Sequence, residues 1–452
     1  MKNQKLIGVT ASMLAALLVP GASWALEGGH EFEIVGRTMY WNDTGLKTQT
    51  TTTPVSYQQS AVGLQLNYKS PYWANIVGFD TSILTVVKFD GNGTPSTSIL
   101  EVENSGQVAD HFSTLSQATI KFNLADIGQI RVGRQTQSGL LLSSSSTRAA
   151  PDTFAGVTAT LTPLQGLQLY GAVYDQWRAR SSSNFEKFKT ESTGVGVVNE
   201  IDYIAIGGAR YMNGSYEVRA EYLNAKDYLA KYGVVVSYKL PVDKNILKFT
   251  GGVFGSQDAG SLFVCGAEKE MDCTGTGRMS HSATGVYLDA DWKAGDFSLG
   301  GAVSTFNGLW IEDNFAANAM KTGTLNQDHG TNPFPTSSIM GPDFANNGET
   351  AWTVRAGYDF NSMIPGLNAN FKYVKGTGAK ASNVINAAIG SENYKELNVR
   401  YALPFAKNLL LSYSYGDYSS YIENFSATDT IKGLTRASWQ LHRMYLDYSL
   451  KF

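Results

Sequence analysis

The last thirteen residues, 440–452, place the strongest limit on what this chain can fold into. Their sequence, QLHRMYLDYSLKF, alternates with a period of two, so that every second residue from Met444 to Phe452 is apolar or aromatic. The residues between them, from Arg443 to Lys451, are mostly polar or charged. This pattern predicts a β-strand with one apolar face. Such a face meets a second sheet in a soluble sandwich and meets lipid in an outer-membrane barrel, and this strand alone leaves both open.

The N-terminal segment indicates export from the cytoplasm. Two lysines precede a largely apolar stretch, residues 6–19, and small residues follow at Ser23 and Ala25. This is the order of a secretory signal peptide. A transmembrane anchor is the alternative, but the apolar stretch is too short to span a bilayer and a proline ends it. We therefore expect residues 1–25 to be a signal peptide and residues 26–452 to be the mature chain.

Composition limits the class of the mature chain. It has no run of eighteen apolar residues, so the sequence predicts no helical membrane span. Without the two lysines of the signal the net charge is about −5, which is not the balance of a nucleic-acid-binding protein. The 46 Gly, 24 Tyr and 21 Phe suit strands and turns, whereas only 12 Pro argue against a disordered chain. No linker divides the chain, so we expect residues 26–452 to form one domain.

The repeating unit of the chain is a strand, a short turn, a second strand and a longer polar segment. The short turns are rich in Pro, Gly and Asn and lie at residues 70–77, 125–128, 163–166, 212–214, 241–245, 294–295, 362–366 and 404–407. The longer segments lie at residues 43–56, 90–111, 136–153, 181–200, 225–229, 259–280, 308–349, 379–392 and 421–439.

These eight short turns and nine longer connections join eighteen strands. Strict alternation of short turns and long loops is typical of a bacterial outer-membrane barrel. A soluble β-helix would instead show a fixed short repeat, and the sequence has none. The sequence therefore predicts an all-β fold, a transmembrane antiparallel β-barrel of eighteen strands with long extracellular loops.

The same alternation assigns cations to the inside of the barrel. The cations in phase with the polar face that we expect in the lumen are Lys88, Lys121, Arg131, Arg178, Arg180, Arg219, Arg355 and Arg400. An ionised side chain that faces lipid at the bilayer midplane costs about 2–4 kcal/mol, which favours inward placement. A column of arginines in a narrow pore attracts anions and offers bidentate sites for carboxylates. The alternative is that acids such as Asp175, Glu217 and Glu221 balance these charges and leave no selectivity.

Two segments resemble a known family. Residues 133–156, GRQTQSGLLLSSSSTRAAPDTFAG, combine a strand end, a serine-rich stretch and the pattern S-x-R-x-x-P-x-x-F-x-G. This order resembles the third loop of the OprD family of substrate-specific outer-membrane porins. Residues 341–352, GPDFANNGETAW, are similar to the D-F-x-x-x-G-E segment that precedes a late strand in the same family. Chain length, signal, strand spacing and the terminal phenylalanine agree over essentially the whole chain.

The resemblance implies a barrel whose third and seventh loops fold inward to form a narrow eyelet, with a ladder of basic residues leading solutes through it. The pore and substrate-binding residues implied are Ser143, Ser144, Ser145, Ser146 and Arg148 on the third loop, Asp343 on the seventh loop, and Arg131, Arg178 and Arg180 on the ladder. Arg134 joins them, although its phase points away from the lumen, because phase is least informative at a strand end.

The resemblance also implies passive, partly selective uptake of small water-soluble nutrients, often carboxylates such as amino acids or aromatic acids. We expect this channel to prefer solutes that carry a carboxylate, through a constricted pore lined by basic residues. A sub-branch of the family passes chito-oligosaccharides, which requires aromatic rails in the lumen. The candidates for such rails are Tyr170, Tyr174, Tyr445 and Trp41.

Two further classes of function are alternatives for such a barrel, an outer-membrane hydrolase and a non-conducting adhesin. The sequence contains neither a G-x-S-x-G nor an H-E-x-x-H motif, and we expect its five His to have no catalytic role, so we expect no enzyme. An adhesin would use long loops such as residues 308–349, but it would need no basic lumen. The sequence shows no spaced ligand set, so we expect no cofactor and no metal.

The expected partners are outer-membrane lipid and small hydrophilic solutes, with no nucleic acid. A monomer and a trimer both fit the pattern, because a trimer contact would use the same kind of apolar face that meets lipid.

The two cysteines, Cys265 and Cys273, stand in the short segment CGAEKEMDC. In an oxidising envelope compartment such a pair most often forms a disulfide that closes a small loop. A metal site is the alternative, but two thiols without a neighbouring His make a poor one. We expect the disulfide, and the resemblance to the family does not extend to it.

Overall fold

The computed structural model describes residues 28–45, 55–92, 99–100, 108–190, 199–263, 282–308, 310, 313–317, 327–338, 340–341, 343–380, 389–422 and 437–452. In these residues the chain is almost entirely β-structure, with one short 3-10 helix at Ala125–Ile127. No helix among them is long and apolar enough to cross a membrane. The two cysteines and residues 1–25 lie outside the described ranges.

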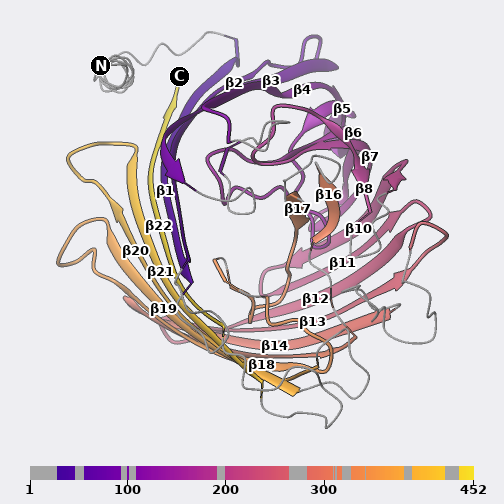
Figure 1. The fold of residues 1–452 in the computed structure, drawn as a ribbon. Helices are drawn as coiled ribbons and strands as arrows, with labels where there is room; N and C mark the ends of the chain where they lie inside the picture. Colours follow the sequence, from indigo (N-terminus) through magenta and orange to yellow (C-terminus); the bar gives the residue numbers. More distant parts are fainter. Residues whose placement is uncertain are drawn as a thin grey trace.

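Eighteen of the strands in the described chain form one closed barrel, which Figure 1 shows as a ring with loops inside it. They are β1 (Glu31–Gly45), β2 (Val55–Lys69), β3 (Val77–Asn92), β4 (His111–Asn123), β5 (Gly128–Gln135), β6 (Thr153–Leu164), β7 (Leu167–Arg178), β10 (Ile204–Asn213), β11 (Tyr216–Ala225), β12 (Leu229–Val242), β13 (Asn245–Asp258), β14 (Ser282–Ala294), β15 (Phe297–Asn307), β18 (Thr350–Asp359), β19 (Leu367–Lys380), β20 (Ile389–Ala402), β21 (Leu409–Ile422) and β22 (Ala437–Lys451).

The barrel is antiparallel throughout and closes between its first and last strands. Each barrel strand pairs with the next along the chain, β7 with β10 and β15 with β18 included. Strand β1 pairs with β2 on one side and with β22 on the other, in a register that places Glu33 opposite Lys451 and Arg37 opposite Asp447. The prediction of eighteen strands joined by alternating short turns and long loops is confirmed.

The two faces of the barrel follow from the period-two pattern. On β7, Leu169 and Val173 are 38% and 49% exposed on the outer face, whereas Ala172 and Tyr174 are buried on the inner one. On β12, Tyr232, Val234 and Val236 are likewise exposed at every second position. An apolar outer band combined with a polar interior is the surface that a transmembrane barrel requires.

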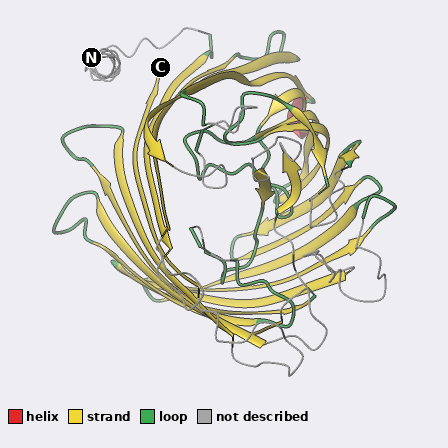
Figure 2. Ribbon diagram, viewed as in Figure 1, coloured by secondary structure: helices red, strands yellow, loops and turns green. Residues whose placement is uncertain are grey.

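The interior is partly filled by chain that connects the strands (Figure 2). Four short strands form a small inner sheet: β8 (Glu186–Lys189), β9 (Glu200–Ile201), β16 (Asp313–Ala317) and β17 (Gln327–Gly330). β8 pairs with β9 and with β16, and it is linked to the wall by its pairing with β7. These strands belong to the fourth and seventh loops, so both loops enter the barrel.

Candidate functional site

The third loop, residues 136–152 between β5 and β6, is fastened to the barrel wall at its tip. The backbone N–H groups of Leu140 and Leu141 donate to the two carboxylate oxygens of Glu221 on β11, at 3.0 and 2.8 Å. The Ser143 N–H donates to the Thr331 hydroxyl of the seventh loop at 3.1 Å. The tip is therefore held by a strand three places away from β6 and by the seventh loop.

The other arm of the third loop is fastened across the barrel to β1 and β22. The Arg37 guanidinium, paired with Asp447 at 2.6 Å, donates to the Ser146 and Arg148 carbonyls. The Tyr445 hydroxyl donates to the Thr147 carbonyl at 3.3 Å.

The wall also leaves room for this arm at β2. A Cβ at Gly63 would lie 2.3 Å from the carbonyl oxygen of Ala149, so only glycine allows the loop to approach so closely. The contacts at the tip and those on this arm hold the loop across the lumen, and the loop narrows the lumen there.

The seventh loop, residues 308–349, enters the barrel from the opposite side. Lys372 of β19 donates to the Ser337 carbonyl, and the Thr336 hydroxyl donates to Ser304 of β15 at 2.9 Å. Phe334 packs at the centre of an aromatic cluster, 4.6 Å from the ring of Phe306. This cluster fixes the loop by burying apolar side chains.

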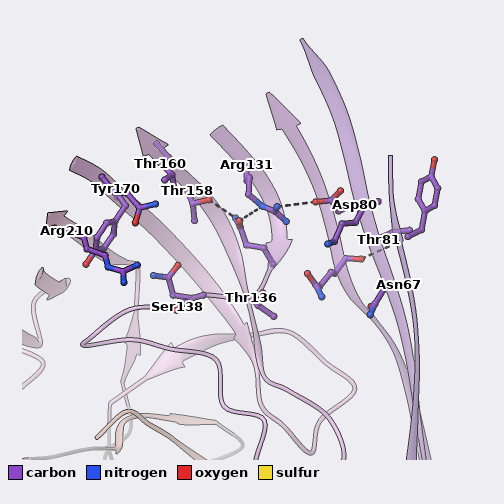
Figure 3. Close-up of a pocket in the computed structure, with 18 of the residues that line it drawn as sticks. Asn67, Asp80, Thr81, Arg131, Thr136, Ser138, Thr158, Thr160, Tyr170 and Arg210 are labelled. Carbon is purple, nitrogen blue, oxygen red and sulfur yellow. Dashed lines mark hydrogen bonds and ion pairs between the residues drawn. The ribbon is translucent and has the colours of Figure 1, made fainter. Parts of the chain in front are cut away.

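A cavity of about 540 Å³ lies between the third loop and the short-turn end of the barrel (Figure 3). Its lining is mostly polar and comes from β1 to β7, from β10 and β11, and from the base of the third loop. The cations that line it are Lys69, Arg131, Arg210 and Arg219, and the aromatic residues are Tyr68 and Tyr170. Two acids, Glu33 and Asp80, line the cavity as well, so its wall carries charges of both signs.

Arg131 is the cation at the centre of this cavity. Its guanidinium contacts Asp80 at 3.1 Å, as Figure 3 shows, and donates to Gln135 at 3.3 Å. Asp80 also pairs with Lys121 at 2.7 Å. Lys121 is buried and donates to the Ser70 carbonyl at 2.7 Å, so it stabilises the wall near a short turn. Of this trio Arg131 and Asp80 line the cavity, and the Arg131 side chain is the more exposed of the two, at 26% against 7%.

A second group of cations lies at the third loop itself. The guanidinium of Arg148 lies 3.8 Å from the ring centroid of Trp41, and that of Arg443 lies 3.2 Å from the same ring. Arg443 is buried and pairs with Asp43, whereas Arg180 donates to the hydroxyls of Ser145 and Thr147 at 3.1 and 2.8 Å.

Burial, followed by the positive charges of Arg180 and Arg443, lowers the pKa of Arg148 well below its usual value. Among the ion pairs of the described residues, none joins Arg148 to a carboxylate, and the acid that acts on it, Asp43, is already paired with Arg443. An anion at Arg148 would therefore find an uncompensated positive field.

Arg178, which we expected on the basic ladder, is fully buried. Its guanidinium donates to the carbonyls of Ala179 and Ser182 at 3.0 and 2.9 Å, to the Pro151 carbonyl and to the Thr153 hydroxyl. These acceptors belong to the ends of the third loop and the start of the fourth. Its position is that of a cross-link between two loops, away from the water of the lumen.

The remaining cations from the sequence lie in different surroundings. Arg219 donates to the Tyr170 hydroxyl at 3.1 Å in the cavity. Arg355 lies in a smaller cavity formed by β14, β15 and β18 to β20, where Asp289 and Asp291 pair with it. Arg134 donates to the Leu115 carbonyl and stacks on Phe185, in phase with the outer face; it does not line the main cavity.

The serines of the third loop make hydrogen bonds through both their backbone and their hydroxyl groups, and the Ser144 hydroxyl accepts from the Gln137 N–H at 3.0 Å. The Ser144 N–H donates to the Gln137 carbonyl at 2.8 Å, and the Ser145 N–H donates to Asp152 at 2.5 Å. Ser146 is exposed. Asp343 is half-buried in the seventh loop, next to buried Phe344.

The aromatic residues that could have formed stacking rails are mostly covered. Tyr174 and Trp41 are 0% and 7% exposed, and the Tyr174 hydroxyl donates to Gln137 at 2.6 Å. Tyr445 is half-buried beneath the third loop, which leaves Tyr170 as the one member of this set that lines the cavity.

Several residues that shape the lumen were missed by sequence reasoning. The faces of Arg37 on β1 and Arg210 on β10 are ambiguous in the sequence, because a one-residue slip in the strand boundary moves a side chain to the other face. Glu221 was read only as a balancing charge, and Arg443 only as a polar residue of the last strand. The partners of Glu221 and Arg443 are remote in the sequence. The only sequence signal for their role is the inward phase that each shares with other polar residues.

A closed barrel of eighteen antiparallel strands, with an apolar outer face and a polar interior narrowed by its own loops, defines an outer-membrane channel protein. The model of the family described as outer membrane porin, OprD family, matches residues 27–430, so the chain belongs to this family of outer-membrane porins. These proteins are channels rather than enzymes, in contact with membrane lipid and small solutes.

Solved structures of the same kind superpose over most of the chain. OpdK of Pseudomonas aeruginosa, solved with vanillate, is 17% identical with a TM-score of 0.74 and covers 94% of this chain and 99% of its own. OccK9 (OpdG) of P. aeruginosa is 21% identical with a TM-score of 0.74, and the same shares are covered. OccAB4 of Acinetobacter baumannii is 19% identical with a TM-score of 0.72, covering 94% and 98%. No curated protein sequence matches the chain.

Proposed function

We propose that this porin takes up small hydrophilic solutes passively and prefers those that carry a carboxylate. The observation that carries the proposal is the position of Arg148 on the third loop, beside Arg180 and Arg443, without a carboxylate partner among the described residues. A solute carboxylate would supply the missing negative charge and could accept two parallel hydrogen bonds from a guanidinium. The solved structure of OpdK with vanillate, an aromatic carboxylate, is consistent with this substrate class.

The arginines of the cavity support the same preference. Arg131, Arg210 and Arg219 line one continuous space below the third loop, so an anion that passes the eyelet meets further cations. Each of the three has an acidic neighbour, which weakens but does not remove the attraction. Polar side chains such as Gln117 and Thr160 provide hydrogen bonds without adding negative charge.

The chito-oligosaccharide alternative receives less support from the described residues. Sugar rings need exposed aromatic faces along the path, and of the four candidates only Tyr170 lines the cavity. Trp41 is sandwiched between two guanidinium groups and has no face left for a sugar.

The test is a measurement of ion preference in planar bilayers with a salt gradient, comparing the wild type with Arg148→Gln. We expect the wild type to favour anions and the variant to lose most of that preference while it still conducts. Liposome swelling with a carboxylate solute and a neutral solute of equal size gives the second readout. Equal permeability of the two solutes in the wild type, or an unchanged reversal potential in Arg148→Gln, would refute the proposal.

A further inference from the structure

Glu221 of β11 makes an unusual set of contacts for an acid on a barrel wall. Its side chain is almost completely buried, and both carboxylate oxygens accept hydrogen bonds from consecutive backbone N–H groups of the third loop, those of Leu140 and Leu141. The Tyr170 hydroxyl donates to the same carboxylate at 2.8 Å, and Arg219 lies 3.6 Å away. A carboxylate that accepts from two neighbouring N–H groups holds that piece of backbone in one orientation.

This contact holds one end of the loop segment that narrows the pore. Leu140 and Leu141 lie at the tip of the third loop, while the contacts of Arg37 and Tyr445 lie on its other arm. Loss of the tip contact would leave that end attached by the Ser143 bond to the seventh loop, by the Arg219 bond to the Ser138 carbonyl at 3.4 Å and by the packing of the two leucines.

The contact also connects the eyelet to the cavity below it. Arg219 and Tyr170 both line the cavity, and both are held by Glu221 or by each other: Arg219 donates to the Tyr170 hydroxyl, which donates to Glu221. A change at Glu221 therefore alters the loop above the cavity and releases a cation on its wall.

We propose that Glu221 is a positioning residue that fixes the tip of the third loop, residues 139–142, against β11 and thereby sets the width of the eyelet. The proposal rests on the channel function, but it concerns the size and steadiness of the opening and not the preference for carboxylates. Those two properties are measured separately, the first as conductance and current noise, the second as reversal potential.

Three variants separate the tether from its charge. Glu221→Asp keeps the negative charge but is one methylene too short to reach both N–H groups. Glu221→Gln keeps the length but replaces one accepting oxygen by an N–H₂ group that faces a donor. Glu217→Gln is the matched control, because Glu217 lies four residues before Glu221 and on the same face of β11. Its partner is Arg210, at 2.8 Å, and its contacts in the structure do not include the third loop.

In single-channel recordings we expect Glu221→Asp and Glu221→Gln to show a larger mean conductance and roughly tenfold more transitions between conductance levels, since the loss of a charged hydrogen bond shifts a local equilibrium by at least that factor. Glu217→Gln should match the wild type in both. Glu221→Gln should also shift the reversal potential toward anions, because Arg219 loses its counter-charge, whereas Glu221→Asp should not.

Wild-type conductance and noise in both Glu221 variants would overturn the proposal, as would an equal change in Glu217→Gln. Heat-modifiable migration on gels confirms that each barrel is folded before recording. Chymotrypsin cleavage after Leu140, Leu141 and Leu142 reads the position of the loop without any current. Faster cleavage in Glu221→Asp is expected, and an unchanged rate would count against the tether even if the wild type did not conduct.

Discussion

A pair of buried carboxyl groups at the base of the seventh loop predicts that the channel responds to alkaline pH. Glu349, the last residue of that loop, is fully buried, and its Oε2 accepts from the N–H and the side-chain amide of Asn346 at 3.0 and 2.8 Å. The same amide donates to Glu392 of β20 at 3.1 Å, and the Tyr418 hydroxyl donates to Glu392 at 2.8 Å. Among the ion pairs of the described residues, none joins a lysine or an arginine to either carboxyl group.

Two carboxyl groups in such a place cannot both be ionised. Burial, and next the negative charge of Glu392, raise the pKa of Glu349 to about 8. Because the pKa is raised in the closed structure, the stabilisation of the closed loop is complete below the ordinary glutamate value and is lost as pH rises through about 8. The ordinary pKa of a glutamate is near 4.3, so the shift corresponds to a free energy of at most about 5 kcal/mol. This is the largest amount by which ionisation of Glu349 can favour an open loop, in which the carboxylate is hydrated, over the closed loop.

The measurement is single-channel recording of the wild type and Glu349→Gln between about pH 6 and about pH 9, a range that brackets the raised value. We expect the wild type to show more frequent excursions to high conductance above about pH 8 as the base of the seventh loop loosens. Glu349→Gln mimics the protonated acid and should record the low-pH behaviour throughout. Glu200→Gln, which removes an exposed acid of the fourth loop, is the control and should follow the wild type. A wild type whose noise does not change with pH, or a Glu349→Gln variant that still responds, would show that the pair is not the titrating group.

Two substitutions test contacts elsewhere in the barrel. Asp80→Asn leaves Lys121 buried without its counter-charge, so we expect the free energy of unfolding to fall by about 3–5 kcal/mol, seen as a lower temperature for the heat-modifiable gel shift. The same change removes the carboxylate partner of Arg131 and should raise the anion preference measured in bilayers. Gly376→Ala would place a Cβ 1.8 Å from the Oε1 of Glu349, so the seventh loop must move at a cost of about 1–3 kcal/mol. The conductance noise of the Gly376→Ala channel at neutral pH should therefore exceed that of the wild type. Noise equal to that of the wild type would show that the loop accommodates the methyl group.

The barrel could be predicted from the sequence because its determinants are local. Alternation within one strand decides which side chains face lipid, and a short turn follows from a few residues rich in Gly, Pro and Asn. On β7, for example, Leu169 and Val173 are exposed as their phase requires. The count of eighteen strands followed from counting turns, which needs no knowledge of contacts between distant residues.

The site could be predicted only in part, because inward phase does not decide whether a side chain reaches water. Arg178 has the phase of the lumen, but loop backbone covers it and supplies its acceptors. Tyr174 is inward as well and lies under the third loop. Loops that fold into a barrel divide its inner face into covered and open areas, and that division depends on contacts such as Leu141 to Glu221, which are 80 residues apart.

Pairing across the barrel has a second consequence for how selectivity arises. Arg37, Arg131 and Arg355 each have a carboxylate within ion-pair distance, contributed in every case by another strand. A count of inward arginines therefore overstates the positive field, since a paired charge attracts a solute less than an isolated one. Arg148 differs because its neighbours are other cations and an indole ring. It follows that ion preference and eyelet width are carried by different residues, so Arg148→Gln should change the reversal potential with little effect on conductance noise, whereas Glu221→Asp should do the reverse.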